Sequence, residues 1–342
     1  MSESQSAGRS MPASMPAGPA STLLLGATDI RRLVTMKEVI HVVGQAARER
    51  AAGDLIAAPR VGLPGGTLLM AAESAERGGV AAKVVSIATG NRQAGLTTIQ
   101  GLASWLDYTT RRPLLVADTP AVTALRTGAL AGFATQELAP PDASVLAMIG
   151  TGGQALTLVE ACAAVRPVAR VQLASSHRES AEELRRRLRS ARPDLEVRIC
   201  DSVRRAVQDA ALVCLATTSV STLVEAGDVR PDVHINAVGA YRPDMRELGA
   251  SVLGAAELVC SDDPPGALRE AGDLMEAVAC GALRAESIID LGELDARFDR
   301  AQRRGITIFK SVGTASADLA LLDLLWQRAE ADGSIPRFEF SA

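Results

Sequence analysis

The sequence predicts an α/β protein in which a doubly wound parallel sheet is joined to a second, α+β lobe. Three observations lead to this prediction. A glycine-rich turn separates an apolar run from a helical pattern near residue 150. From there to residue 261, apolar strand-like runs alternate with helical patterns. Residues 21–126 differ, because one helical stretch is followed by several strand-like runs.

The glycine-rich turn is the most informative segment of the chain. The apolar run Ser-Val-Leu-Ala-Met-Ile has the length of a buried strand and ends on Gly150, and Gly152, Gly153 and Gln154 follow. A helical pattern then starts at Ala155. This arrangement points the free N–H groups of a helix toward the turn, as a Rossmann-type unit does when it binds a pyrophosphate. Alanine replaces the third glycine of the usual fingerprint, and glycine pairs also occur in plain turns.

The alternation after this turn predicts a parallel sheet that binds a dinucleotide at the carboxyl ends of its strands. Strands are expected at 169–175, 195–200, 211–216, 233–239 and 256–261, and helices at 179–188 and 203–210. The candidate cofactor contacts therefore lie at 150–154, 175–178, 217–219 and 236–241.

The end of the second strand indicates which nicotinamide cofactor is preferred. An Asp or Glu at this place usually binds the adenosine ribose of NAD. Here the residues are Ser175, Ser176, His177 and Arg178, with no acid before Glu179. Hydroxyls and a cation suit a 2′-phosphate, so NADP(H) is favoured and NAD(H) remains possible. The alternative is a polar turn with no role in binding.

Composition excludes several classes of function. The 342 residues carry a formal net charge of −4, which gives no nucleic-acid footprint, and no apolar run is long enough to span a membrane. Five cysteines without a Cys-x-x-Cys pair indicate reduced core residues of a cytoplasmic protein. Three histidines make a His-based metal site improbable. Residues 1–20 have the composition of a disordered leader.

The N-terminal lobe contributes three candidate cations, Arg60, Lys83 and Arg126. Lys83 lies in an apolar strand, where a lysine normally faces solvent; one that points into a cleft can bind a carboxylate or donate a proton. For Arg126 the alternative is a surface salt bridge. The expected elements are a helix within 27–50, strands at 66–70, 80–87, 98–105 and 114–118, and a long helix from residue 123.

The chain resembles the ornithine cyclodeaminase/mu-crystallin family from residue 22 to about 335. The matching segments run in the family's order at 59–60, 82–86, 90–91, 95–101, 123–127, 150–155, 234–240, 242–248 and 309–313. The resemblance implies a homodimer of two-domain chains. A lobe for substrate binding and dimerisation would comprise residues 21–126 and the C-terminal helix at 316–335, and a Rossmann domain would comprise residues 127–315.

The resemblance also implies roles for individual residues. Arg60, Lys83 and Arg126 match the family's substrate-carboxylate binders, and Val312 matches a residue that lines the substrate. Contacts to the cofactor are implied for Thr98, Arg126, Gly153, Gln154, Thr218, Ile235, Asn236, Ala237, Val238 and Ser311.

One departure from the family pattern favours a reductase. Cyclodeaminases place an Asp after Ala-Val-Gly-x as their general acid/base, and Tyr241 stands there in this chain. A phenol, with a pKa near 10, is a poor base at neutral pH. The segment from Arg242 to Leu248 looks more like mu-crystallin and the bacterial reductases of Δ1-pyrroline-2-carboxylate and Δ1-piperideine-2-carboxylate. We therefore expect NAD(P)H-dependent reduction of a cyclic ketimine to an amino acid of the proline or pipecolate type.

Other activities stay open at this stage. The family also includes ornithine and lysine cyclodeaminases and alanine dehydrogenases, and a non-catalytic NADPH-binding protein of the crystallin type is the alternative of another class. For the reduction, Lys83 or an ordered water is the expected proton donor. Tyr241 either borders the pocket or only packs. Asp244 and Glu247 are expected to hold their loop through Arg242 or Arg246.

Overall fold

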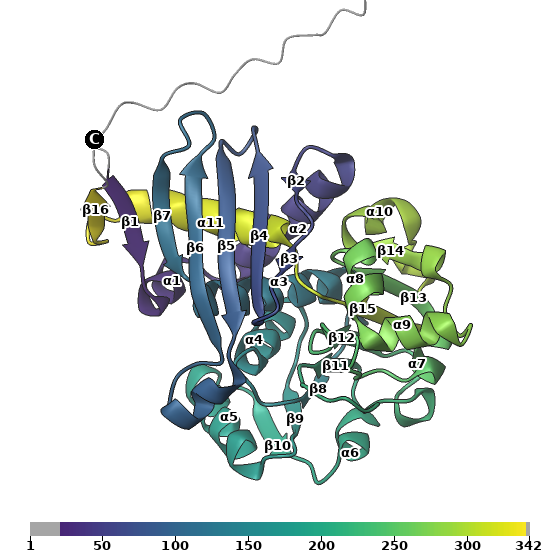
Figure 1. Cartoon of the computed structure of the whole chain (residues 1–342). Helices are drawn as coiled ribbons and strands as arrows, with labels where there is room; N and C mark the ends of the chain where they lie inside the picture. Colours follow the sequence, from purple (N-terminus) through teal and green to yellow (C-terminus); the bar gives the residue numbers. More distant parts are fainter. Residues whose placement is uncertain (1–20, 340–342) are drawn as a thin grey trace, which may run out of the picture.

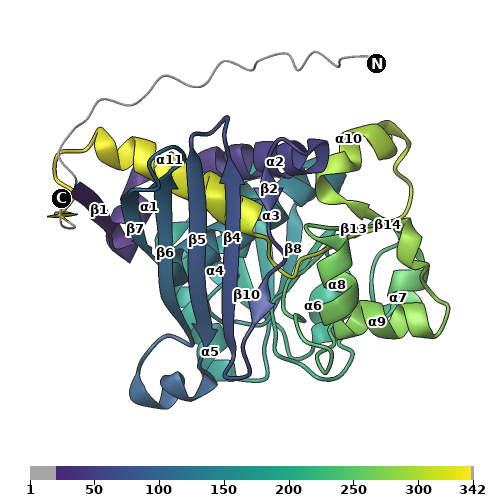
Figure 2. The same ribbon diagram turned by 45° about the horizontal axis from the view of Figure 1, so that its top comes forward.

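The computed structural model describes residues 21–339, which form two sheets with helices packed around them (Figure 1). The leader expected over residues 1–20 lies outside the described residues. In Figures 1 and 2 the first sheet occupies one side of the molecule, and the second sheet with its helices occupies the other.

The first sheet is mixed and mostly antiparallel, with the order β16-β1-β7-β6-β5-β4-β2 and with β3 paired to β4. Its strands are β1 (Ser21–Leu25), β2 (Ile56–Ala57), β3 (Val61–Gly62), β4 (Thr67–Ser74), β5 (Gly79–Ile87), β6 (Ile99–Asp107), β7 (Pro113–Asp118) and β16 (Arg337–Glu339). Only β1 and β7 pair in parallel. The C-terminal helix α11 (Ala315–Glu330) returns to this sheet and packs across β4–β7 (Figures 1 and 2).

The second sheet confirms the predicted doubly wound parallel sheet. Its order is β10-β9-β8-β11-β12-β15-β13-β14, and all neighbouring strands are parallel. Its strands are β8 (Val145–Ile149), β9 (Arg170–Ala174), β10 (Glu196–Ile199), β11 (Leu212–Leu215), β12 (His234–Ala237), β13 (Ala256–Ser261), β14 (Ile288–Asp290) and β15 (Ile306–Lys310). The chain order reverses between β8 and β11, which is where a doubly wound sheet binds its ligand.

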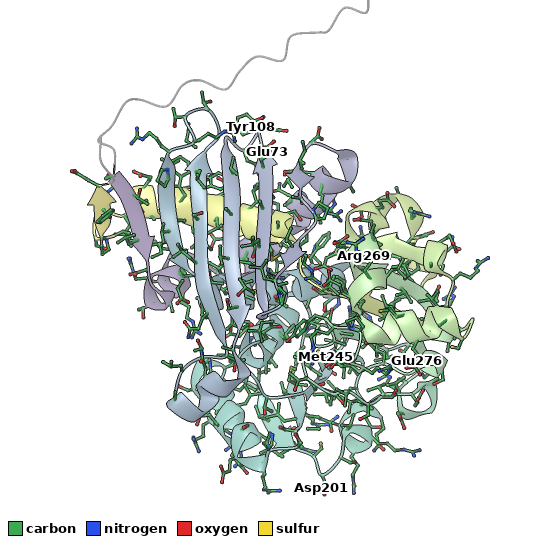
Figure 3. The ribbon with its side chains drawn as sticks, viewed as in Figure 1. Glu73, Tyr108, Asp201, Met245, Arg269 and Glu276 are labelled. Atoms are coloured by element: carbon green, nitrogen blue, oxygen red, sulfur yellow. The ribbon has the colours of Figure 1, made fainter. Side chains whose placement is uncertain are left out.

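The helices cover both sheets and connect their strands. They are α1 (Ala27–Leu33), α2 (Met36–Ala52), α3 (Thr119–Leu138), α4 (Ala155–Val165), α5 (Arg178–Ala191), α6 (Val203–Val207), α7 (Ala250–Gly254), α8 (Pro264–Glu270), α9 (Gly272–Ala279) and α10 (Leu294–Arg297). In Figure 3, Arg269 lies on α8, Glu276 on α9 and Met245 in the segment after β12. None of the helices within residues 21–339 is long and apolar enough to cross a membrane.

The structure corrects two of the expected helices. The single helix expected within 27–50 is broken into α1 and α2, because Thr35 caps α2 and exchanges hydrogen bonds with Glu38 in a capping box. The long helix α3 starts at Thr119 rather than residue 123, because Asp118 accepts a hydrogen bond from the N–H of Ala121 at 2.8 Å.

The cysteine prediction holds for three positions and is wrong for one. Cys162, Cys214 and Cys260 are buried, Cys200 is half-buried and Cys280 is exposed. Cys280 follows the last residue of the short helix α9, where the chain turns back to the surface. The apolar residues of α9 suggested a core position, but only some of them are buried: Leu274 and Ala277 are, whereas Met275 and Ala279 are exposed.

Candidate functional site

The glycine-rich turn has a backbone that only glycine adopts easily at its first position. Gly150 has φ +92°, and a Cβ there would lie 2.4 Å from the carbonyl oxygen of Ala216. The N–H of Gly150 donates to the carbonyl of Ala174 at 2.9 Å, which ties the turn to β9. A Cβ at Gly153, by contrast, would meet nothing within 4 Å. The turn is therefore fixed by its contacts with neighbouring strands at Gly150 and has free space at Gly153, as a bound pyrophosphate requires.

The carboxyl ends of four neighbouring strands continue this edge. Backbone N–H groups just beyond each strand donate to the next strand, from Ala216 to Ile149 at 2.9 Å and from Ser311 to Ala237 at 3.0 Å. The residues at these ends therefore share one edge of the sheet, and the expected contacts Val238 and Ser311 lie on it. Thr218, just beyond β11, is exposed there, whereas the side chain of Ile235 is buried within the sheet.

A buried carboxylate, Glu247, organises the loops along this edge. Its Oε1 accepts from the N–H of Thr217 at 2.7 Å, and its Oε2 accepts from Gly239 at 2.8 Å and Ala240 at 3.1 Å. Burial raises the pKa of Glu247. Glu247 thus holds its loop as expected, but through backbone N–H groups and not through Arg246.

The arginines of that loop have other partners. Arg246 pairs with Glu276 of α9. Arg242 pairs with Asp244 at 2.9 Å, as the sequence suggested. Both contacts lie on the exposed side of the loop, whereas Glu247 is fully buried beneath it.

The residues expected at the adenosine end lie together next to the turn. Thr151 of the turn donates to the hydroxyl of Ser175 at 3.0 Å. Ser176 and Arg178 are exposed, and within residues 21–339 Arg178 has no ion pair. Arg178 is also the first residue of α5, whose first N–H groups have no partner within the helix.

Asn236 differs from the other expected cofactor contacts, because its side chain points into the core. Its amide donates to the hydroxyl of Thr135 at 2.9 Å, and its oxygen lies 3.2 Å from Nε2 of His234. Asn236 is therefore restricted to backbone contacts at the edge. Burial lowers the pKa of His234 to about 3, so this ring is neutral and part of the polar core.

Lys83 and Arg126 meet at one carboxylate, that of Asp318 on α11. Lys83 lies on the inner face of β5. Along this strand Ala81, Lys83 and Val85 are buried, and the residues between them are more exposed. Its Nζ is 2.6 Å from Oδ1 of Asp318, and Nε of Arg126 is 3.2 Å from the same oxygen. All three side chains are buried. Burial lowers the pKa of Lys83 to about 8, with Arg126 and Arg60 acting in the same direction and Asp318 opposing them.

Arg60 reaches the same region from the segment between β2 and β3. Its guanidinium makes a forked contact with Glu270, the last residue of α8, with Nε 2.9 Å from Oε1. It also donates to the carbonyl oxygen of Val312. Arg60 therefore joins the mixed sheet to the loop that follows β15.

The loop after β15 connects the cations to the nucleotide edge. Asp262 accepts from the hydroxyl of Ser311 at 2.7 Å and from the N–H of Gly313 at 3.0 Å. Gly313 has φ +90°, and a Cβ there would lie 2.8 Å from the guanidinium of Arg126. This close approach brings Arg126 under a loop that begins on the edge of the parallel sheet. The three expected cations thus lie close to one another and to the loop that leaves this edge.

Two further expected residues lie in loops, Tyr241 after β12 and Thr98 before β6. Tyr241 is half-buried, and burial raises the pKa of its phenol, so it remains protonated at neutral pH. Thr98 is half-buried in the connection between β5 and β6, where its carbonyl accepts from the N–H of Ala88 at 2.8 Å.

Sequence reasoning missed three carboxylates that hold the cations and their loop: Asp262, Glu270 and Asp318. Asp318 had a detectable signal, because it is an acid among the apolar residues of a helical pattern. The signal for Asp262 was its place directly after a buried strand. The segment from Glu270 to Leu274 resembles the reductase branch of the family, but that resemblance gave Glu270 no role.

Comparison with known proteins gives consistent relatives. The model of the ornithine cyclodeaminase/mu-crystallin family matches residues 20–333. A Δ1-pyrroline-2-carboxylate reductase of Bacillus cereus is 33% identical over 328 residues, covering 93% of this chain and 100% of that protein. The structure of Thermococcus litoralis Δ1-pyrroline-2-carboxylate reductase with NADH and L-proline has a TM-score of 0.87 at 29% identity and covers 92% of this chain and 99% of that one. An archaeal alanine dehydrogenase dimer with bound NAD has a TM-score of 0.86 at 28% identity, covering 94% and 100%.

Proposed function

This chain belongs to the ornithine cyclodeaminase/mu-crystallin family, and we propose that it is an NAD(P)H-dependent reductase that converts a cyclic ketimine carboxylate to an amino acid of the proline or pipecolate type. The observation that carries the proposal is the site itself. The proposal is supported by Arg60, Lys83 and Arg126, which lie close to one another beside the parallel sheet, and by Tyr241, which the family resemblance matches to the cyclodeaminase acid.

The cations would bind the substrate carboxylate. Arg60 and Arg126 carry planar guanidinium groups, which match a carboxylate with paired hydrogen bonds, and Lys83 adds a point charge. Arg60 makes such a forked contact with Glu270, which a substrate carboxylate would have to share or replace. Val312, whose carbonyl accepts from Arg60, would line the same pocket. Holding the substrate at fixed atoms lowers the entropic part of the barrier.

Lys83 is also the proposed proton donor to the imine nitrogen. A pKa of about 8 keeps its ammonium charged at neutral pH while leaving the proton easier to transfer than from an ordinary lysine. Tyr241, with its raised pKa, would serve as a wall of the pocket and not as a base. This assignment disfavours ornithine cyclisation, which needs a base to activate the attacking amine.

The chain takes a nicotinamide cofactor, which supplies hydride when it is bound. The turn at Gly150–Gln154 would hold its pyrophosphate, because Gly153 leaves the approach to the helix N-terminus clear. The two related structures contain NADH and NAD. Our preference for NADP(H) in this chain is supported by its own residues Ser175, Ser176 and Arg178, of which Arg178 is an exposed cation.

We also propose a homodimer in the cytoplasm, formed through the outer face of the mixed sheet. A row of apolar side chains crosses four strands there, with Val61 opposite Leu69, Leu69 opposite Val84 and Val84 opposite Leu102. These side chains are between 39% and 54% exposed. Such an apolar surface is typical of an interface between subunits. A Val84→Glu variant should change the mass in light scattering from twice 35.6 kDa to 35.6 kDa; a dimeric variant would contradict this interface.

The proposed reaction is tested by following cofactor oxidation with five- and six-membered cyclic imino acids. Steady consumption of NADPH with formation of proline or pipecolate supports the reductase. A cyclodeaminase would instead release ammonia from ornithine or lysine without net oxidation of the cofactor. Ammonia release without net oxidation, or no turnover with any imine, would reject the proposal.

The role of the cations is tested by alanine variants at Arg60, Lys83 and Arg126. Loss of a buried charge-assisted contact costs about 2–4 kcal/mol, so kcat/KM should fall roughly 30- to 1000-fold in each variant. Near-normal kcat/KM in all three would exclude a carboxylate clamp. Arg186→Ala, at an exposed position on α5, is the control for a general effect of removing arginine.

A further inference from the structure

Within residues 21–339, Asp318 is the one acid that forms ion pairs with two of the proposed substrate-binding cations. Its Oδ1 lies 2.6 Å from Nζ of Lys83 and 3.2 Å from Nε of Arg126, and the side chain is 2% exposed. These three residues come from three separate elements. Lys83 lies on β5, Arg126 on α3, and Asp318 on the C-terminal helix α11, 235 positions after Lys83.

The carboxylate offsets repulsion that the fold would otherwise leave unbalanced. The charged groups that face Lys83 are Asp318 from α11, Arg126 from α3 and Arg60 from the segment between β2 and β3. Asp318 is the only acid among them. Two buried cations without an anion would repel each other and favour loss of the lysine proton.

We infer that Asp318 is a positioning residue of the proposed reduction, whose carboxylate fixes Lys83 as an ammonium group and orients Arg126 for the substrate carboxylate. This inference rests on the proposed function. Asp318 acts through the two cations and does not itself touch the substrate. Its second oxygen, Oδ2, is buried and has no hydrogen-bond partner within the described residues, so the carboxylate hydrogen-bonds Lys83 through Oδ1 and meets Arg126 as an ion pair.

The inference predicts a change in the pH dependence of the reaction. In Asp318→Asn, the amide keeps the shape of the carboxylate but loses its charge. Lys83 then loses the group that favours its charged form, so its pKa falls below about 8. The alkaline limb of kcat/KM should move to lower pH by about one unit, which is a loss of about fivefold near pH 8, approaching tenfold above about pH 9, beyond any loss near pH 6. At each pH, kcat/KM of the variant is divided by kcat/KM of the wild type. Titration of the substrate affects both values equally and therefore cancels.

A matched control lies on the same helix. Asp323 is buried as well and pairs with Arg77 at 3.1 Å, away from Lys83. Asp323→Asn therefore removes a buried ion pair of the same kind, and its pH profile should coincide with that of the wild type. Thermal unfolding of both variants measures any loss of structure separately from the profile.

The results separate the inference from the proposed function. A wild-type enzyme that reduces imines, with Asp318→Asn unchanged in its alkaline limb, would overturn the role of Asp318 and leave the reductase standing. No imine reduction by the wild-type chain would overturn both. If Asp318→Asn does not fold, Asp318→Glu tests the same point, because it keeps a carboxylate beside Lys83, and the alkaline limb should stay close to that of the wild type. A limb that moves to lower pH by a full unit in Asp318→Glu would likewise overturn the inference.

Discussion

Replacing Arg178 with alanine should weaken the binding of NADPH and leave the binding of NADH nearly unchanged. Arg178 is exposed at the start of α5, beside Ser175 and Ser176, and within residues 21–339 it has no ion pair that would compete for a phosphate. Its proposed partner is the 2′-phosphate that distinguishes NADPH from NADH.

The size of the effect follows from the exposure of the arginine. In water, two unit charges about 4 Å apart attract each other by about 1 kcal/mol. A phosphate carries up to about two negative charges, so the contact contributes about 1–2 kcal/mol, or about a 5- to 30-fold increase in KM for NADPH. Because exposed charges are screened by salt, the preference of the wild type for NADPH should shrink as ionic strength rises.

The assay is the initial rate of imine reduction at varied NADPH and, separately, at varied NADH. Arg186→Ala is the control, since Arg186 is exposed on the same helix and pairs with Glu183. Equal increases in KM for both cofactors in Arg178→Ala would refute a phosphate contact. So would a wild-type KM for NADPH that does not respond to salt.

Two further predictions concern the nucleotide turn and the buried histidine. Gly150→Ala should lower the melting temperature, because φ is +92° and the new Cβ would lie 2.4 Å from the carbonyl of Ala216. Gly153→Ala should leave the melting temperature unchanged and raise the Kd for NADPH. Equal melting temperatures in the two variants would contradict this difference. His234 becomes protonated below about pH 6.5 in the unfolded chain but only near pH 3 in the folded chain. The free energy of unfolding therefore decreases as the pH is lowered from 6.5 to 3, by about 2 kcal/mol at pH 5. The free energy of unfolding, measured in urea at both ends of this pH range, should depend less on pH in His234→Gln than in the wild type. A variant of the exposed His41 is the control and should keep the wild-type dependence. An undiminished dependence in His234→Gln would exclude His234 as the cause.

The parallel sheet could be predicted because its signals are local. Each strand is a short apolar run and each turn contains glycine or polar residues, so Gly150 and the alternation after it were sufficient. Strand β15 was missed as an element of the sheet. It is the eighth strand in chain order from β8 onward but lies between β12 and β13, and such an insertion depends on contacts distant in sequence.

The cations could be found, but their partners could not. Lys83 drew attention because a charge is unusual in an apolar strand, and the resemblance to the family then gave its role. Its partner Asp318 is 235 positions away, and no spacing rule joins a strand to a helix at that separation. The same applies to Arg60 and Glu270, which are 210 positions apart. Pairs of this kind are set by the folding of the two sheets against each other.

The central claim is that the cation cluster holds an α-imino carboxylate so that hydride reaches the carbon of its C=N bond. The most direct test uses NADPH that carries deuterium at both C4 positions, with Δ1-pyrroline-2-carboxylate as substrate and mass and NMR spectra of the product. The account predicts proline with one deuterium at the α-carbon. Unlabelled proline, deuterium at another carbon, or no proline at all would contradict it.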